Sequence, residues 1–201
     1  MNKEKLARLH KKEAVDVLTA SFWNYPVMTY TLQDAGNRYE ESLRAMVGFF
    51  CENRLIRNGP LLGLQVEEEV VAVACIDVPS EKAAPEDLHQ EFAQLGKLIG
   101  SAAIARLERY ETESIRFAPT APHHFLGIIG VHPDHQKRGY ARILLDEIHG
   151  MSASDALSTG VCLNTEEASN VAFYRYFGYE VIGEADIDSI HTWCMFRANP
   201  R

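Results

Sequence analysis

The segment with the strongest chemical signal is 126–142, where an apolar strand leads through a basic loop into a helix. The first N–H groups of a helix have no partner within it, and the helix dipole favours an anion at that end. Gly139 has no Cβ, so an anion can approach the backbone closely, and Ala141 keeps that approach open. Three basic side chains add positive charge: Lys137, Arg138 and Arg142. A phosphate or pyrophosphate site is one interpretation, and a plain strand-to-helix turn with solvated basic residues is the other.

Length and composition narrow the class of protein. The chain has 201 residues, 46% of them hydrophobic and 24% charged, which fits a single globular domain over residues 1–201. Its formal net charge of −8 argues against nucleic-acid binding. No apolar run is long enough to span a membrane, and Met1 to Lys5 lead into no secretory signal. We therefore expect a cytoplasmic monomer or homodimer without a nucleic-acid or membrane partner.

The cysteines and loop histidines give little sign of a metal site. The four cysteines are far apart in the chain, which favours reduced, packed thiols over disulfides or a zinc site: Cys51, Cys75, Cys162 and Cys194. His132 and His135 are separated by two residues, but the loop offers no third ligand. We expect no metal.

Apolar spacing and turn residues predict the elements that must position this segment. Helices are expected at Glu13–Trp23, Asn37–Asn58, Tyr140–Met151 and Ala168–Phe177, with a long helical stretch over Pro85–Glu113 that Gly96 and Gly100 interrupt. Strands are expected at Leu61–Val66, Glu69–Val78, Phe125–Val131, Val161–Leu163, Tyr179–Gly183 and Thr192–Phe196. Asn24 to Pro26 should break the first helix. The order predicts an α/β fold with a mixed sheet and a parallel unit in its second half.

Two motifs in this order resemble the coenzyme A signature of the GNAT N-acetyltransferase superfamily. The first is Gln136-x-x-Gly139-x-Ala141 after the strand that ends at Val131, and the second is the helix that carries Asn170 and Tyr174. That helix is followed by a glycine and an aromatic residue, as in the family. One departure is Lys137, which stands where the family often has glycine.

The closing run Thr192-Trp193-Cys194-Met195 resembles, more narrowly, the branch that contains puromycin N-acetyltransferase. The specific motifs lie within Phe125 to Met195, and the N-terminal half is similar only in the order of its elements. The resemblance implies a mostly antiparallel sheet with a splayed parallel strand pair that binds acetyl-CoA. It also implies a primary or secondary amine as the acceptor.

The resemblance assigns cofactor-binding roles to two groups of residues. The backbone of the strand would pair with the pantetheine arm at Ile129, Gly130 and Val131. The loop and helix start would hold the pyrophosphate and the adenosine 3′-phosphate: Gln136, Lys137, Arg138, Gly139, Tyr140, Ala141 and Arg142. Asn170 would either contact the cofactor arm or serve as a surface or capping asparagine.

The resemblance also implies direct transfer, in which most of the catalysis comes from holding the two reactants together. Tyr174 lies where the family places the general acid for the leaving thiolate, and a core aromatic is the alternative. A backbone N–H near Ile129 or Gly130 would stabilise the carbonyl oxygen. Among the histidines beside the strands, His123, His124 and His191, we expect His124 as the base, although an exposed strand-end histidine is the alternative for each.

The acceptor pocket should draw on Phe22, Tyr25, Tyr30 and the stretch Pro85–Glu113, whose aromatic rings could stack on a cationic amine. Trp193 and Cys194 either line the acceptor side or belong to the strand core. The sequence favours an N-acetyltransferase of a small-molecule amine. The alternatives are a protein lysine or N-terminal acetyltransferase and a coenzyme A binder without turnover.

Overall fold

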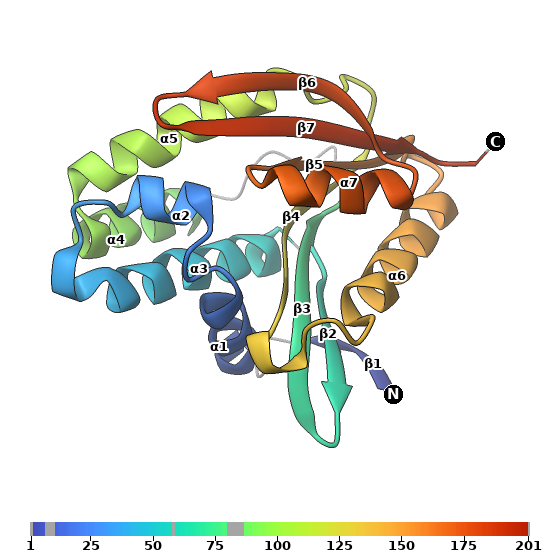
Figure 1. Ribbon diagram of the computed structural model, residues 1–201, viewed down its shortest axis with the longest axis horizontal. Coiled ribbons are helices and arrows are strands. Elements are labelled where there is room, and N and C mark those ends of the chain that lie inside the picture. The colour runs from blue at the N-terminus through green and yellow to red at the C-terminus, as the bar shows by residue number, and fades with distance from the viewer. Residues whose placement is uncertain (1, 7–10, 58, 80–86, 201) are drawn as a thin grey trace.

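The computed structural model describes residues 2–6, 11–57, 59–79 and 87–200, which form one mixed sheet with helices on both faces (Figure 1). The helices are α1 (Lys11–Ser21), α2 (Pro26–Thr31), α3 (Tyr39–Ile56), α4 (Asp87–Ile99), α5 (Ser101–Ile115), α6 (Tyr140–Ser154) and α7 (Ala168–Tyr176). Short 3₁₀ turns lie at η2 (Gly36–Arg38) and η3 (Pro133–His135). The strands are β1 (Asn2–Leu6), β2 (Leu61–Val66), β3 (Glu69–Asp77), β4 (His124–Val131), β5 (Gly160–Thr165), β6 (Glu180–Ile187) and β7 (Ile190–Ala198).

The sheet has the strand order β1-β2-β3-β4-β5-β7-β6. All neighbouring pairs are antiparallel except β4 and β5, which run parallel. The predicted fold class, a mostly antiparallel sheet with one parallel pair in the second half, is confirmed. No helix among the described residues is long and apolar enough to cross a membrane.

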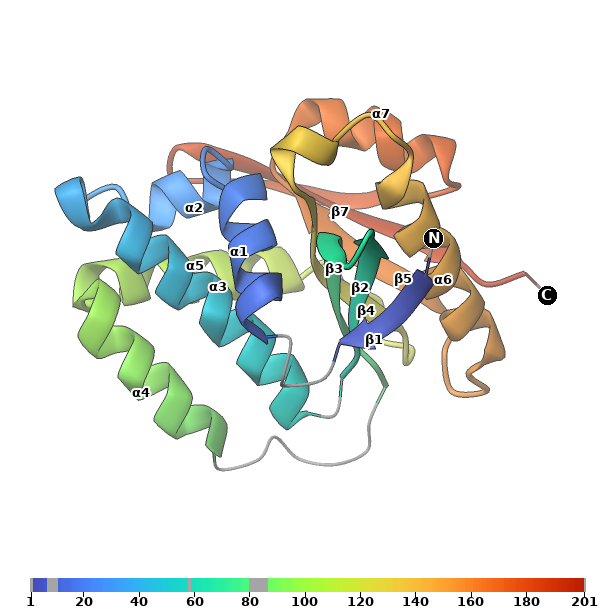
Figure 2. The same ribbon diagram turned by 90° about the horizontal axis from the view of Figure 1, so that it is seen from below.

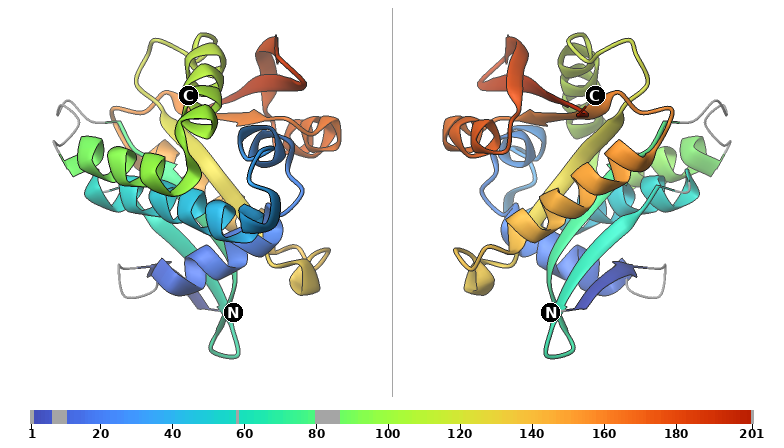
Figure 3. Two further views of the ribbon diagram at one scale, coloured as in Figure 1. Left: turned by 90° about the vertical axis from the view of Figure 1, so that its left-hand side faces the viewer. Right: turned by 90° about the vertical axis from the view of Figure 1, so that its right-hand side faces the viewer.

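The sheet separates two hydrophobic cores. One core lies under α1 to α5 and includes Leu18, Leu43 and Met46, and the other lies under α6 and α7 and includes Leu145 and Ile148. Figure 2 shows the first group of helices on the side opposite α6, and the right-hand view of Figure 3 shows α6 crossing its face with α1 and α3 behind. The near-continuous burial of β3 fits its central place between these layers.

Two elements differ from the sequence prediction. The structure adds the edge strand β1, and it adds α2 where the proline was expected only to break a helix. Pro26 occupies the first turn of α2, where a missing backbone N–H removes no helical hydrogen bond. In the stretch that follows β3, Gly100 separates α4 from α5 at φ 87°, whereas Gly96 lies inside α4. The expected helix boundaries at Asn58 and Pro85 lie outside the described residues.

The parallel pair separates soon after it begins. β4 and β5 are paired at three positions only, the last being Leu126 with Leu163. Opposite β3, the register passes from Leu126 to Ile128, so Gly127 is an extra residue in β4. Such a bulge bends a strand, and here it coincides with the point where β4 leaves β5. The rest of β4 therefore has a free edge on the side of β5.

A buried arginine fills the space beside this bulge. Arg54 of α3 forms an ion pair with Asp77 at 3.1 Å, and a Cβ on Gly127 would stand 2.9 Å from the Arg54 Cζ. Glycine is thus the residue that lets α3 approach the bulged strand. The arginine therefore packs against the bulged part of β4 from the α3 side.

Candidate active site

The loop before α6 has the backbone conformation of an anion cradle. Gly139 caps the helix in the left-handed conformation at φ 82°, and no side chain caps the helix start. The first intrahelical hydrogen bond runs from the N–H of Ile143 to the C=O of Gly139, so the N–H groups of Tyr140, Ala141 and Arg142 have no partner within the helix. The space beside Gly139 is open, so the positive φ, rather than close packing, explains the glycine.

Lys137 also has a left-handed backbone, at φ 61°. A side chain is strained in that conformation, which gives a physical reason for the glycine that the family often has there. The side chains of Lys137 and Arg138 are exposed, and Arg138 donates to the C=O of Asp134 at 3.2 Å. Tyr140, in contrast, is buried in the α6 core, so its part in the cradle is limited to its backbone N–H.

Arg142 is exposed, and its guanidinium lies against two aromatic residues at the end of α7. Its Nη2 donates to the Tyr176 hydroxyl at 2.7 Å, and its guanidinium lies 5.2 Å from the Tyr176 ring centroid. It also lies 5.5 Å from the Phe177 ring centroid. Tyr176 therefore fixes the direction of a positive charge beside the cradle.

The free edge of β4 offers the backbone of alternate residues. His132 donates its N–H to the C=O of Val71 on β3, and Val131 lies opposite Ala72 in the ladder. Because hydrogen bonding alternates along an antiparallel strand, Gly130 faces β3 while Ile129 and Val131 face the splay. The C=O of Val131 already accepts from Ser21 Oγ at 2.9 Å and from Gln136 Nε2 at 3.3 Å. The main-chain groups available to a ligand are thus chiefly those of Ile129.

The prediction for Gly130 is corrected accordingly. Its backbone belongs to the β3 ladder, so it is not placed to pair with a pantetheine arm or to donate to a carbonyl oxygen in the splay. A Cβ on Gly130 would stand 2.8 Å from Ser21 Oγ and 3.0 Å from Leu18 Cδ2. The glycine lets α1 pack directly on β4.

Tyr174, on α7, is 7% exposed and belongs to the core under α6 and α7. Within the described part of the chain its hydroxyl makes no hydrogen bond. Burial, and then the nearby carboxylate of Glu166, raise the pKa of Tyr174 and keep the phenol protonated. A protonated hydroxyl without a partner is the state that a proton donor requires.

Asn170, one turn earlier on α7, donates from Nδ2 to Thr165 Oγ1 at 3.2 Å. Thr165 is the last residue of β5, on the edge that β4 has left. The asparagine therefore ties α7 to the splayed end of β5. Within the described residues this is its one side-chain hydrogen bond.

The structure corrects the prediction of His124 as the base. His124 is 2% exposed and lies at the paired end of β4 and β5, opposite Val161. Its Nδ1 is hydrogen-bonded to Ser158 Oγ at 3.0 Å, and burial lowers its pKa. Five residues of strand separate it from Ile129, about 17 Å at the usual rise per residue. It is a core histidine that stabilises the β5 entry.

The other two histidines also lie away from the splayed edges. His123 Nδ1 contacts the C=O of Ala121 at 2.8 Å. His191 Nδ1 contacts Asp186 Oδ1 at 2.6 Å, and its ring stacks on Trp193 with centroids 4.3 Å apart. Trp193 packs against the α7 core, whereas Cys194 is buried with its sulfur 3.6 Å from that of Cys162.

A buried carboxylate that sequence reasoning missed lies directly after β5. Glu166 is 8% exposed, and its Oε1 accepts from Tyr110 Oη at 2.7 Å and from Thr192 Oγ1 at 2.8 Å. Its backbone N–H donates to Tyr25 Oη at 3.1 Å. Burial raises the pKa of Glu166 although these hydroxyls stabilise its charge. These contacts come from three parts of the chain, α5, β7 and the residue before α2, and no spacing in the sequence predicts them.

The predicted acceptor aromatics divide into two groups. Tyr25 reaches the end of β5, where its hydroxyl is 3.0 Å from Thr165 Oγ1, and Phe22 packs edge-on against its ring. Tyr110 comes from the predicted helical stretch and joins them through Glu166. Tyr30 instead donates to Asp188 in the β6–β7 turn at 2.7 Å. It supports the hairpin rather than the end of β5.

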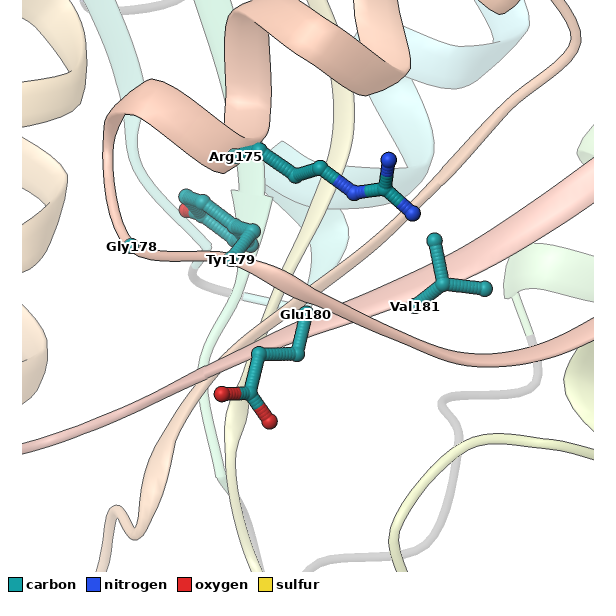
Figure 4. A pocket seen from close by; sticks show the side chains of 5 residues that line it. All are labelled: Arg175, Gly178, Tyr179, Glu180 and Val181. Atoms are coloured by element: carbon teal, nitrogen blue, oxygen red, sulfur yellow. The ribbon is translucent and has the colours of Figure 1, made fainter.

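The described residues contain no group of three or more His, Cys, Asp or Glu side chains that could hold a metal. Their four cysteines are buried and free. A shallow pocket of about 430 Å³ lies at the turn between α7 and β6 (Figure 4). Its lining contains none of the predicted site residues: Arg175, Gly178, Tyr179, Glu180 and Val181.

The splayed parallel pair, the cradle before α6 and the tyrosine on α7 all lie in one continuous part of the chain. Residues 86–181, slightly less than half of the chain, match the family model of the acetyltransferase (GNAT) domain. This part of the chain is therefore similar to GNAT acetyltransferases. Enzymes of this family use acetyl-CoA as the acetyl donor.

Several solved structures share the whole fold at low sequence identity. The histone acetyltransferase HPA2 and related acetyltransferase of Corynebacterium glutamicum superposes with a TM-score of 0.74 at 20% identity, covering 100% of this chain and 97% of that one. The ribosomal-protein-S18-alanine N-acetyltransferase of Escherichia coli gives 0.60 at 13% identity, covering 100% and 94%. The PaiA N-acetyltransferase of Thermoplasma acidophilum, in complex with coenzyme A, gives 0.60 at 11%, covering 98% of each chain.

Proposed function

We propose that this protein transfers the acetyl group of acetyl-CoA directly to the amine of a small molecule. The observation that carries the proposal is the position of Tyr174, whose protonated, unpartnered hydroxyl lies on α7 beside the splayed end of β5. Direct transfer needs no covalent enzyme intermediate. It needs two bound reactants and a proton donor for the leaving thiolate.

The residues present fit the donor substrate. The free N–H groups at the start of α6 and the positive charge of Arg142 suit a pyrophosphate, and the free main-chain edge at Ile129 suits the amide groups of pantetheine. Gln136 would secure the edge through the C=O of Val131. Acetyl-CoA supplies the activated acetyl group as a thioester.

Side chains close over the end of β5 from the α2 and α5 side, which favours a small acceptor. Tyr25 and Tyr110 lie far apart in the chain, yet both contact the end of β5. The Tyr25 hydroxyl contacts Thr165, and the Tyr110 hydroxyl contacts Glu166. A peptide acceptor needs an open path for its backbone, and these rings narrow that path. The E. coli structure named above acts on an alanine of a ribosomal protein, so a protein acceptor is the second candidate.

We also propose a branch of the family, a domain organisation and a cellular location for this protein. The run Thr192–Met195 and the Asn170–Tyr174 spacing favour the branch that contains puromycin N-acetyltransferase. We propose a single catalytic domain over residues 1–201, working in the cytoplasm as a monomer or homodimer. No nucleic acid or membrane partner is proposed, consistent with the net charge of −8.

The test measures coenzyme A release from acetyl-CoA with a thiol-reactive dye. The acceptor panel contains puromycin, polyamines, amino acids, aminoglycosides and lysine peptides. Release stimulated by a small amine, and abolished in Tyr174→Phe without loss of acetyl-CoA binding, supports the proposal. Stimulation by peptides alone favours the protein acceptor. Tight acetyl-CoA binding without stimulated release across the panel favours a binder without turnover.

A further inference from the structure

The carboxylate of Glu166 is buried without a positive partner. No Lys, Arg or His in the described part of the chain forms an ion pair with it, and the hydroxyls that hydrogen-bond its side chain, those of Tyr110, Thr192 and Tyr25, are neutral. Burying an ionised carboxylate is strongly unfavourable unless a charge or hydrogen bonds compensate. The Tyr110 and Thr192 hydroxyls both donate to Oε1, and neither of them contacts Oε2. A bound cation would supply the positive charge that the described side chains do not.

Three tyrosines surround the carboxylate from three different elements. Tyr110 lies on α5, Tyr25 precedes α2, and Tyr174 lies on α7. Burial, and then the nearby carboxylate of Glu166, raise the pKa of all three phenols. The remaining neighbour, Thr192 on β7, carries no titratable group. Aromatic rings around a carboxylate suit an organic ammonium ion, because ring faces and carboxylate both attract the positive charge.

The position of Glu166 in the fold indicates where a bound cation would lie relative to Tyr174. Glu166 follows β5 three residues beyond Leu163, the last residue paired with β4. Its carboxylate lies on the α5 face of the sheet, bound to Tyr110, whereas Tyr174 approaches from the α7 face. A cation held by Glu166 would therefore lie on the opposite face from the proton donor, at the splayed end of the strand that both contact.

We propose that Glu166 binds the acceptor as a protonated alkyl amine and takes its proton. This assignment rests on the proposed acetyl transfer and names the acceptor class, an alkylammonium rather than a neutral arylamine. The ammonium N–H bond breaks, and its proton passes to Oε2. The freed nitrogen lone pair forms the N–C bond to the acetyl carbon while the C–S bond breaks.

Each proton in this reaction has a defined donor and acceptor. The thiolate takes the Tyr174 proton, and the second proton of the reacting nitrogen returns to the Tyr174 oxygen. Glu166 then releases its proton to water, so one proton is released for each amine acetylated.

The first test compares two acceptors of similar shape and different charge, benzylamine and aniline, the latter neutral at pH 7. Glu166→Gln should lower kcat/KM for benzylamine by about 100-fold and that for aniline by less than about 3-fold. The affinity for coenzyme A should not change. Glu167→Gln removes an equal charge one residue away, and it should change neither acceptor by more than about 2-fold. An equal fall for both amines in Glu166→Gln would overturn the proposal.

The second test reads binding without turnover. Calorimetry with coenzyme A present should show benzylammonium binding to the wild type about 100-fold more tightly than to Glu166→Gln. Binding that depends on Glu166 in a protein that acetylates no amine would separate a failed transfer from a correct cation subsite. Equal or absent binding in both proteins would overturn the proposal.

The third test is the pH profile of kcat/KM for benzylamine. Activity should fall at low pH as Glu166 becomes protonated, and Glu166→Gln should lose this acid limb. In Tyr110→Phe the limb should move to higher pH, because the hydroxyl that stabilises the carboxylate is gone. A merely structural role would leave the limb in place, and that result contradicts the assignment.

Discussion

The two faces of the sheet present polar groups from different parts of their residues. On the α6 and α7 face, the polar groups are chiefly main-chain: the N–H groups at the start of α6 and the free edge of β4 at Ile129. On the α1 to α5 face, they are side chains bonded to one another around Glu166. Main-chain recognition suits a ligand common to a whole family. A side-chain network suits a ligand that differs between its members.

The two faces also differ in how well they tolerate amino-acid substitutions. Main-chain groups persist through most substitutions, provided that the backbone keeps its conformation. A side-chain hydroxyl or carboxylate, in contrast, is lost when its own residue is substituted, and its hydrogen bonds are lost with it. The four predictions below use this contrast.

The largest effect is expected at Tyr174, which serves transfer from the α7 face. Tyr174→Phe should lower kcat by about 10²–10⁴-fold, because the leaving thiolate loses its proton donor. Coenzyme A affinity, measured by calorimetry, should stay within about 2-fold. Turnover at the wild-type rate would remove the general-acid assignment and leave the tyrosine as a core aromatic.

The β-bulge at Gly127 should be nearly as sensitive to substitution. In Gly127→Val the new side chain would overlap the Arg54 guanidinium, and the free energy of unfolding should fall by about 3 kcal/mol. Denaturant unfolding measures the loss. The same substitution in an Arg54→Ala background should be clearly less harmful, since the overlapping group is gone. An equal loss in both backgrounds would mean that the arginine does not set the bulge.

A pair of substitutions in the cradle tests backbone conformation against side-chain charge. Gly139→Val should weaken coenzyme A binding about 10-fold, because a β-branched residue is strained at φ 82°. Lys137→Gly should keep the affinity within about 3-fold and change stability by less than about 1 kcal/mol, since relief of strain offsets added chain entropy. A large loss of affinity in Lys137→Gly would show that the lysine charge matters more than the backbone.

The smallest effect concerns the stability contributed by Glu166. Its pKa is raised in the folded state, so the folded protein binds more protons there than the unfolded chain, and stability falls as pH rises above the unfolded pKa. Glu166→Gln should therefore raise the free energy of unfolding by about 1 kcal/mol at pH 8 and leave it nearly unchanged at pH 4. A loss of stability at pH 8 would show that the hydroxyls compensate the charge fully.

The elements of the α6 and α7 face could be predicted from the sequence for a physical reason. The cradle, the helix start and Tyr174 follow one another within a short stretch of chain, so their order alone carries the pattern. Local signals were less reliable for short elements. Pro26 was interpreted as a break because a proline disfavours helix before it, yet the same residue begins α2.

The α1 to α5 face could not be predicted in the same way. Tyr110 and Glu166 are separated by 56 residues, and Tyr25 and Glu166 by 141. Only the fold brings them together, and each residue type alone is ordinary. His124 is the opposite case. Its place in the sequence beside β4 suggested a catalytic base, but the strand register places it where β4 and β5 are still paired.

The place of β7 in the sheet has a consequence for synthesis on the ribosome. β7 follows β6 in the chain but lies between β5 and β6. Until residues 190–198 emerge, the nascent chain presents β5 as an open edge and lacks Thr192, one of the donors to Glu166. An unpaired β edge invites association with other chains. Translation past β7 is thus the step that both completes the acceptor side and ends the exposure of the nascent protein to aggregation.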